Sequence, residues 1–385
     1  MDDELSKILA MPLTNRNALK LERLAGRRLK RGDAAFVADL GIGLARHHRS
    51  AAEFDGLFDR LVRRLAVTRG AGNVGQLLRL LAAGGPDDPE YDRYVASVLA
   101  ACRRPEDLTV VFDDGPGGGA ASEELRACLL HELVLRGVPV ADTPGIAAWA
   151  TSPHWRDHPL GGLPLAPMAA EREPDLPYYG IDGGSYGLPY GDPEDRHPAP
   201  RQAGGVPAAV ETTTAAIAEA LAAPVANWVD EGEPSEARVE ARTFAFAEPL
   251  EPGAVPHALV ALGPDCLADL GELPRPGEET AFGVVAVEPA EVWRVLFAAA
   301  STGGPYESGC YGAYGRLHAW RALAALAGAR ADASPGEVEE HVRGCAWYRF
   351  GADTAWFHRV VWDLGVLAVG PDRRRLALLA ATATD

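Results

Sequence analysis

A stretch rich in proline and glycine divides the chain into two differently patterned parts. Residues 153–207 contain eleven prolines and nine glycines, in a chain of 385 residues. Because proline lacks a backbone donor and glycine is conformationally permissive, long helices and strands are excluded from this stretch. The sequence therefore predicts a mostly α-helical domain at 1–150, a Pro/Gly-rich aromatic loop segment at 151–207 and a second domain at 208–385.

The middle segment also carries large aromatic residues: Trp155, Tyr178, Tyr179, Tyr186 and Tyr190. Long loops with such side chains usually pack over a domain surface or have a function of their own. His154, Asp157 and His158 lie close together in the same segment. Imidazole and carboxylate groups can bind a metal ion, but exposed loops have the same pattern, and we assign no metal site.

Helical periodicity dominates the first 150 residues. Apolar residues at 54, 57, 58, 61, 62 and 65 follow the i, i+3, i+4, i+7 spacing, with Ser50 as a candidate N-cap. Similar patterns follow Asp33, Asn73 and Asp88-Pro89. Helix starts recur about every twenty residues, so two helices per unit would match a helical repeat of roughly 34–47 residues. The units share no consensus, which favours an ordinary helical domain, with a solenoid as the alternative.

A strand-like run at 108–112 precedes a glycine-rich stretch and a helix expected at 122–136. This order is typical of phosphate-binding loops, in which helix amides face the anion. The patterns GxxxxGK[ST] and GxGxxG are both absent, however, and Asp113 and Asp114 would repel a phosphate. The stretch favours a surface turn over a nucleotide site.

Zinc and disulfide frameworks are also disfavoured. His131-Glu132 begins like an HExxH motif, but Leu135 occupies the second histidine position. The five cysteines are an odd number, are widely spaced and include no CxxC pair.

The last part of the chain mixes strands and helices. Strands are expected at 238–246, 282–287 and 345–350, and helices at 208–222, 289–302, 311–328 and 334–344. Apolar runs at 356–369 and 374–384, joined by a turn at 370–373, predict a C-terminal β-hairpin that is covered on both faces. The predicted fold class is therefore α+β: a helical N-terminal domain, a Pro/Gly-rich middle segment and a C-terminal mixed sheet with helices.

Charge and composition restrict the class of function. The net charge of −17 argues against partners that are nucleic acids or anionic membranes. The N-terminus lacks the apolar core of a secretory signal, and no run approaches the roughly 20 apolar residues that span a bilayer. We expect an acidic, soluble, cytoplasmic protein, and no pattern identifies a cofactor.

One cysteine lies where a helix dipole could activate it. Cys310 stands at the expected start of the 311–328 helix, and helix amides favour the thiolate form. His358 follows on an expected strand, with Asp363 as a candidate to orient the imidazole. Cysteine at a helix start and then histidine on a strand is the order of papain-like hydrolases, although C-G-[SA]-C-[WY] is absent. The alternative is that Cys310 is a small packed residue.

Polar and aromatic residues around this cysteine are candidates for binding a protein partner or an anionic small molecule: Tyr306, Glu307, Tyr311, Tyr314, Arg316 and Trp320. More tryptophans and arginines follow between 347 and 362, where most large aromatics on alternating strands would be core.

The segment YESGCYGAYGRLHAWRALAALAG and the closing LGVLAVGPDRRRLALLAATATD resemble a family of uncharacterised proteins from actinomycetes. That family has no assigned activity, so the resemblance implies a bacterial cytoplasmic protein and no mechanism. The leading hypothesis is a ligand- or partner-binding protein. The alternative is a cysteine-dependent hydrolase that uses Cys310 and His358.

Overall fold

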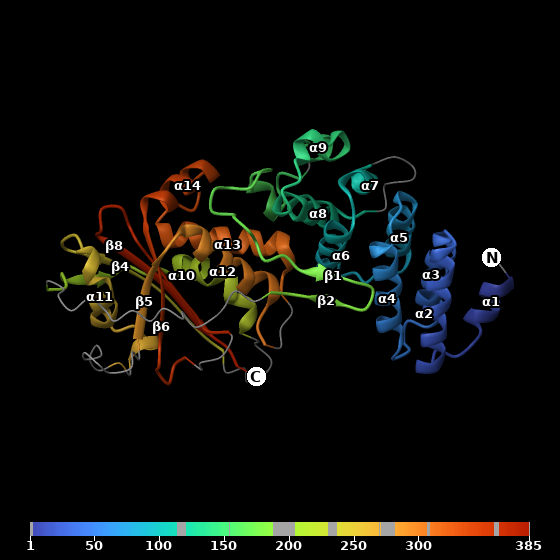
Figure 1. Ribbon diagram of the computed structural model, residues 1–385, viewed down its shortest axis with the longest axis horizontal. Helices are drawn as coiled ribbons and strands as arrows, with labels where there is room; N and C mark the ends of the chain where they lie inside the picture. The colour runs from blue at the N-terminus through green and yellow to red at the C-terminus, as the bar shows by residue number, and fades with distance from the viewer. Residues whose placement is uncertain are drawn as a thin grey trace. The chain divides into compact units, whose positions relative to one another are not determined.

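A computed structural model describes residues 3–113, 121–153, 155–187, 205–229, 237–268, 270, 282–305, 309–357 and 362–384. The chain divides into two compact units (Figure 1). The first, which we call the helical unit, comprises Met1–Ala166 and Leu176–Tyr186. The second, which we call the sheet unit, comprises Pro167–Asp175 and Gly187–Asp385. Helices in the N-terminal half and a six-stranded sheet in the C-terminal half confirm the predicted α+β class.

The helical unit is built mainly from α-helices. They are α1 (Asp3–Leu9), α2 (Asn15–Lys30), α3 (Ala34–His47), α4 (Phe54–Val67), α5 (Ala71–Gly84), α6 (Pro89–Cys102), α7 (Pro105–Leu108), α8 (Glu123–Leu135) and α9 (Pro144–Ala150). Asp33 and Asp88 cap α3 and α6 as predicted. The predicted cap Ser50 is wrong, because Glu53 occupies the N-cap position of α4. The helix expected after Asn73 starts earlier, at Ala71.

Alternate helices of this unit pack against one another. α2 contacts α4, α4 contacts α6, and α6 contacts α8, while α3 contacts α5 (Figure 1). Helical repeats stack in this way, so the arrangement resembles the solenoid alternative more than the ordinary helical domain that the sequence favours. α3 also contacts α1, α2 and α4, and its side chains Val37 and Leu40 are fully buried.

The strand expected at 108–112 is wrong. Pro105 starts the short helix α7, and Thr109–Phe112 continues as a turn of 3-10 helix. Leu108, Val111 and Phe112 are buried at i, i+3 and i+4, which is helical spacing, so packing overrides the β propensity of the run. The glycine-rich residues that follow, at 115–119, lie outside the described residues.

In the part of the sheet unit that the structure describes, six strands form a single antiparallel sheet. Its strands, in the order β3–β4–β8–β7–β6–β5, are β3 (Ala209–Glu211), β4 (Arg238–Phe246), β8 (Arg375–Thr382), β7 (Leu364–Val369), β6 (Ala346–Ala352) and β5 (Phe282–Val287). The helices of this unit are α10 (Ala215–Ala222), α11 (Val255–Leu262), α12 (Pro289–Thr302), α13 (Tyr311–Ala327) and α14 (Pro335–Gly344).

Both faces of the central strands are covered. Every residue of β7, and every residue of β8 except the first, is buried. Phe244, Leu376 and Leu378 form a core with Leu259 of α11 on one face. Residues alternate between faces along a strand, and α13 contacts β7 and β8 from the other side (Figure 1). The expectation of a C-terminal hairpin covered on both faces is confirmed.

Two predicted boundaries in this unit differ from the structure. The helix expected over 208–222 is split, because residues 209–211 pair with β4 and Thr214 caps a helix that begins only at Ala215. The run at 356–369 forms a strand only from Leu364, and residues 358–361 lie outside the described residues. Within the described ranges, no helix combines the length and the apolar composition needed to cross a bilayer.

Candidate functional site

Cys310 lies at the N-cap of α13, as the sequence predicts. Its backbone N–H donates to the carbonyl of Ala300 at 2.9 Å, and its thiol lies 2.9 Å from the same oxygen. The contact holds the loop before α13 against the end of α12.

The predicted catalytic partners of Cys310 are only partly described. His358 lies outside the described residues, as do Tyr306 and Glu307. Asp363 precedes β7 and accepts a hydrogen bond from the Thr382 hydroxyl at 2.6 Å. The arrangement of cysteine, imidazole and carboxylate therefore stays a prediction.

Arg316 and Trp320, predicted to bind a ligand, are buried in the sheet unit. The Arg316 guanidinium donates to Glu171 through Nε at 2.6 Å and Nη2 at 2.9 Å. The Trp320 indole donates to the same carboxylate at 2.5 Å, and the backbone N–H of Met168 at 2.8 Å. Glu171 thus ties the segment Pro167–Asp175 to α13. Sequence reasoning missed Glu171, because nothing in a Pro/Gly-rich segment marks one carboxylate as the partner of an arginine 145 residues away.

The other predicted binding residues also lie on α13. Tyr311 has a backbone φ of 59°, in the left-handed region. Tyr314 is buried, with its ring centroid 6.2 Å from that of His318. Their role in binding stays a prediction. Of the tryptophans that follow, Trp347 is buried and donates to the carbonyl of Val342 at 2.8 Å.

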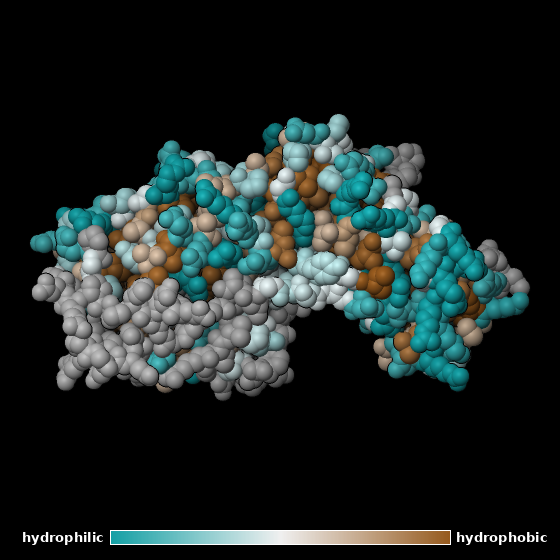
Figure 2. Space-filling model, viewed as in Figure 1, coloured by the Kyte–Doolittle hydropathy of each residue, from teal (hydrophilic) through white to brown (hydrophobic). Residues whose placement is uncertain are grey.

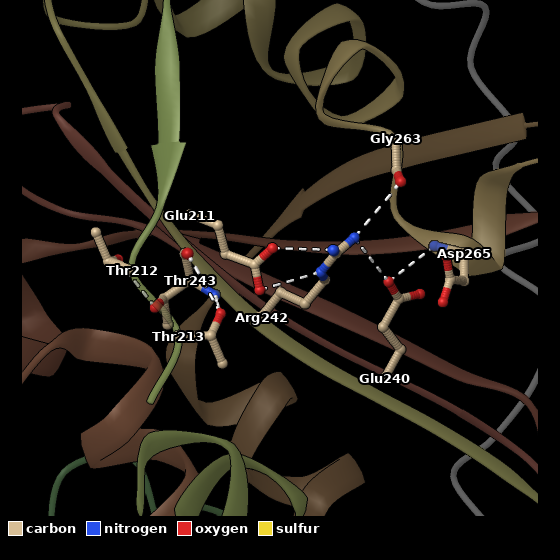
Figure 3. Close-up of polar contacts among 8 residues, drawn as sticks. All are labelled: Glu211, Thr212, Thr213, Glu240, Arg242, Thr243, Gly263 and Asp265. Carbon is tan, nitrogen blue, oxygen red and sulfur yellow. Dashed lines mark hydrogen bonds and ion pairs between the residues drawn. The ribbon is translucent and has the colours of Figure 1, made fainter. Parts of the chain in front are cut away.

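A second polar network joins β3, β4 and the loop after α11 (Figure 3). Arg242 donates to Glu211 at 2.9 Å and lies 3.4 Å from Glu240. The buried Glu240 carboxylate accepts the backbone N–H groups of Asp265 and Cys266, both at 2.8 Å. These contacts fasten the edge strand and the loop to the sheet, so we interpret the network as structural.

Ion pairs connect helices of the helical unit, and we call this series of ion pairs the ladder. Glu22 of α2 pairs with Arg60 and Arg64 of α4, at 3.0 and 2.7 Å. Farther along, Arg93 of α6 pairs with Glu124 of α8 at 2.8 Å.

The ladder continues to His158, whose Nε2 lies 2.8 Å from the Glu124 carboxylate. Burial raises the pKa of Glu124, but hydrogen bonds from His158 and Arg93 outweigh it and hold that pKa below its usual value. His154 lies outside the described residues, and no cluster of three potential metal ligands occurs within the described ranges.

Four tyrosines from α6 and from the segment Leu176–Tyr186 come together in the helical unit. The rings of Tyr91 and Tyr94 are 5.9 Å apart, those of Tyr94 and Tyr179 are 6.2 Å apart, and those of Tyr179 and Tyr186 are 6.5 Å apart. Arg63 of α4 donates to the Tyr94 hydroxyl at 2.8 Å. We call these five residues the tyrosine cluster.

The cluster anchors a small hairpin that we call the tyrosine hairpin (Leu176–Tyr186). Its two strands are β1 (Tyr178–Tyr179) and β2 (Gly184–Ser185). Tyr179 is 5% exposed and donates to Ser97 of α6 at 3.1 Å, whereas its neighbour Tyr178 is 76% exposed. Ile181 at the turn is 43% exposed. Sequence reasoning noted the tyrosines of the hairpin but could not predict that they meet Tyr94 of α6, so far away in the chain.

Comparison with known proteins places the chain in a family. A sequence model of a family of unknown function (DUF6183) matches residues 20–385. No curated protein and no solved structure matches the chain.

Proposed function

Because the chain belongs to the DUF6183 family, whose function is unknown, we propose a function from the geometry alone: the protein binds a partner protein through its tyrosine hairpin. The observation that carries the proposal is the contrast between adjacent tyrosines. Tyr179 is held inside the helical unit, while Tyr178 is displayed to solvent.

The fixed position of the hairpin supports this function. A two-stranded hairpin is marginally stable by itself, and this one has only two residues in each strand. The Tyr179 ring packs against Tyr94, and the Cys102 thiol lies 3.7 Å from the Tyr179 carbonyl. Tyr178 therefore lies on a hairpin that is already held in place, and this lowers the entropic cost of binding a partner.

The chemistry of the displayed side chains also supports a protein partner. Tyrosine is enriched at the energetic centres of protein interfaces, since it combines a large apolar ring with a hydroxyl. Ile181 adds an exposed aliphatic side chain to the same hairpin. The α2–α4–α6–α8 stacking supports the same proposal, because stacked helical repeats commonly serve as binding surfaces.

The test compares what three variants retain from a lysate of the source cells. Tyr178→Ala/Ile181→Ala removes the displayed side chains, and Tyr179→Ala removes the anchor while keeping Tyr178. The control, Val210→Ala/Val229→Ala, removes exposed apolar side chains from the sheet unit. We expect a protein that the wild type and the control retain, and that both hairpin variants lose. Purified, that protein should bind the wild-type chain in a titration.

The proposal fails if no retained protein depends on the hairpin, or if the control loses the same protein. Circular dichroism must show that the Tyr179→Ala chain keeps its helical content. The Tyr178→Ala/Ile181→Ala variant changes only exposed positions, so its result stands even if Tyr179→Ala unfolds the unit.

A further inference from the structure

A straight stripe of five basic side chains runs along the outer side of α2. Arg16, Lys20, Arg23, Arg27 and Lys30 are spaced i, i+4, i+7, i+11 and i+14, and all five are exposed. At about 100° per residue they fall within an arc of about 80°. The buried residues Ala18, Leu21, Ala25 and Leu29 lie on the opposite side of the helix.

The stripe is positively charged, whereas the chain as a whole carries a net charge of −17. The whole sequence has 37 basic and 54 acidic residues, yet α2 has six basic residues and a single acidic one, Glu22. Glu22 pairs with arginines of α4. Among the described residues, no ion pair involves any of the five cations of the stripe. Figure 2 shows hydrophilic side chains over the part of the helical unit where α2 and α3 lie.

Neither helix stability nor solubility explains the stripe. Cations near the end of a helix suit its dipole, which accounts for Arg27 and Lys30. Arg16 lies in the first turn, where the dipole disfavours a cation and where α2 has no acidic residue. Like charges at i, i+3 and i, i+4 repel one another. A face that served only solubility would mix both signs.

We propose that the basic stripe of α2 binds an acidic helix of a partner protein. At a helical rise of about 1.5 Å per residue, the cations span about 21 Å and recur every 4.5–6 Å or so along the helix axis. Carboxylates on one face of a second helix recur at the same interval, so two helices lying side by side match charge for charge. In an extended chain, side chains on one face recur every 6.6 Å or so, which does not match the spacing of the cations on α2.

Two observations favour a helix of a protein over a membrane or a nucleic acid. The apolar side of α2 is buried within the helical unit, which leaves little apolar surface to enter a bilayer. Leu19, beside the stripe, is 46% exposed and can pack against a partner helix but gains nothing from a phosphate backbone. This surface is separate from the tyrosine hairpin, and its test does not depend on the hairpin.

The test uses fluorescence anisotropy with defined probes and the full chain. The first probe is an alanine-rich helical peptide with glutamates at i, i+4, i+7, i+11 and i+14, and the second distributes the same glutamates around the helix. Duplex DNA and phosphatidylserine vesicles are the third and fourth. The stripe variant is Arg16→Gln/Lys20→Gln/Arg23→Gln. The control, Arg69→Gln/Arg104→Gln/Arg343→Gln, removes the same charge at exposed positions elsewhere.

We expect the wild type and the control to bind the first peptide equally, and the stripe variant to bind it about tenfold more weakly, since three charge pairs are lost. Added salt should weaken the binding, and the second peptide should bind less tightly. Equal losses in both variants, equal binding of both peptides, or no binding of the first peptide would overturn the proposal. Tighter binding of DNA or vesicles through the same three residues would overturn it as well.

Discussion

Replacing Glu171 by glutamine distinguishes a structural role of Arg316 and Trp320 from a role in ligand binding. The Glu171 and Arg316 side chains are 1% and 0% exposed, so their ion pair is fully enclosed in the sheet unit. Glutamine keeps the shape of the side chain but removes the negative charge that faces the guanidinium. Removing one member of a buried ion pair costs about 3–5 kcal/mol, because the remaining charge stays out of water.

The hydrogen bonds that Glu171 accepts support a loss of folding stability within this range. One carboxylate oxygen accepts Arg316 Nε and the Trp320 indole, and the other accepts Arg316 Nη2 and the Met168 N–H. Glutamine retains one acceptor oxygen, and its amide group turns a donor toward the groups on the other side. For a domain of 150–250 residues, each kcal/mol shifts the unfolding temperature by about 2–4 °C, so we expect a fall of about 6–20 °C.

Differential scanning calorimetry of three chains measures this effect: the wild type, Glu171→Gln, and the double variant Glu171→Gln/Arg316→Met. The double variant removes both charges and fills the space with an apolar chain, so it should regain much of the loss. If Glu171→Gln unfolds within about 2 °C of the wild type, the reasoning from the buried pair is refuted. A double variant no more stable than Glu171→Gln would also contradict it.

Two further predictions concern the ladder of the helical unit and the cysteine. Glu124→Gln should cost about 2 kcal/mol at neutral pH, since it weakens charge-assisted hydrogen bonds from His158 and Arg93. The folded-state pKa of Glu124 lies below the ordinary value of 4.5, so its charge stabilises the folded chain above that pH. The difference in unfolding temperature between wild type and variant should therefore be constant above pH 4.5 and should vanish as the pH falls through the folded-state pKa. A difference in unfolding temperature that did not change with pH would contradict this. Cys310 should react with iodoacetamide no faster than free cysteine at neutral pH, since its thiol donates to a backbone carbonyl. Rapid labelling that His358→Ala abolishes would support the hydrolase alternative instead.

Local signals in the sequence predicted much of the secondary structure. The start of α14 is an example, because Ser334 and Glu337 form a reciprocal capping box that can be read from four residues. The turn between β7 and β8 is another, with Arg373 in the left-handed region at a φ of 58°. Such features depend on neighbours in the chain and therefore show in the sequence.

Features that depend on distant partners could not be predicted in this way. The run at 108–112 has β-branched residues, yet the buried positions of Leu108 and Val111 require a helical turn. Glu171 and Arg316, and likewise Tyr94 and Tyr179, meet only after folding. Burial and pairing over such separations leave no periodic pattern in the sequence. For this reason the sequence predicted that Arg316 binds a ligand, although it pairs with Glu171.

The two proposed surfaces differ in physical character. The tyrosine hairpin offers exposed side chains with large apolar surfaces, whose binding should change little with salt, whereas the stripe on α2 offers exposed cations, whose binding should weaken with salt. If one partner used both surfaces, its affinity for the wild type should fall steeply with added salt. Its affinity for the variant Arg16→Gln/Lys20→Gln/Arg23→Gln should then depend much less on salt.

The most direct test of the central proposal places a photo-crosslinking amino acid, p-benzoylphenylalanine, at position 178 in living cells, with the same substitution at Val210, another exposed apolar position, as a control. If the tyrosine hairpin binds a partner, Tyr178→p-benzoylphenylalanine should crosslink to one discrete protein that the control at 210 does not capture. The same set of products from both positions, or no product from position 178, would contradict the account.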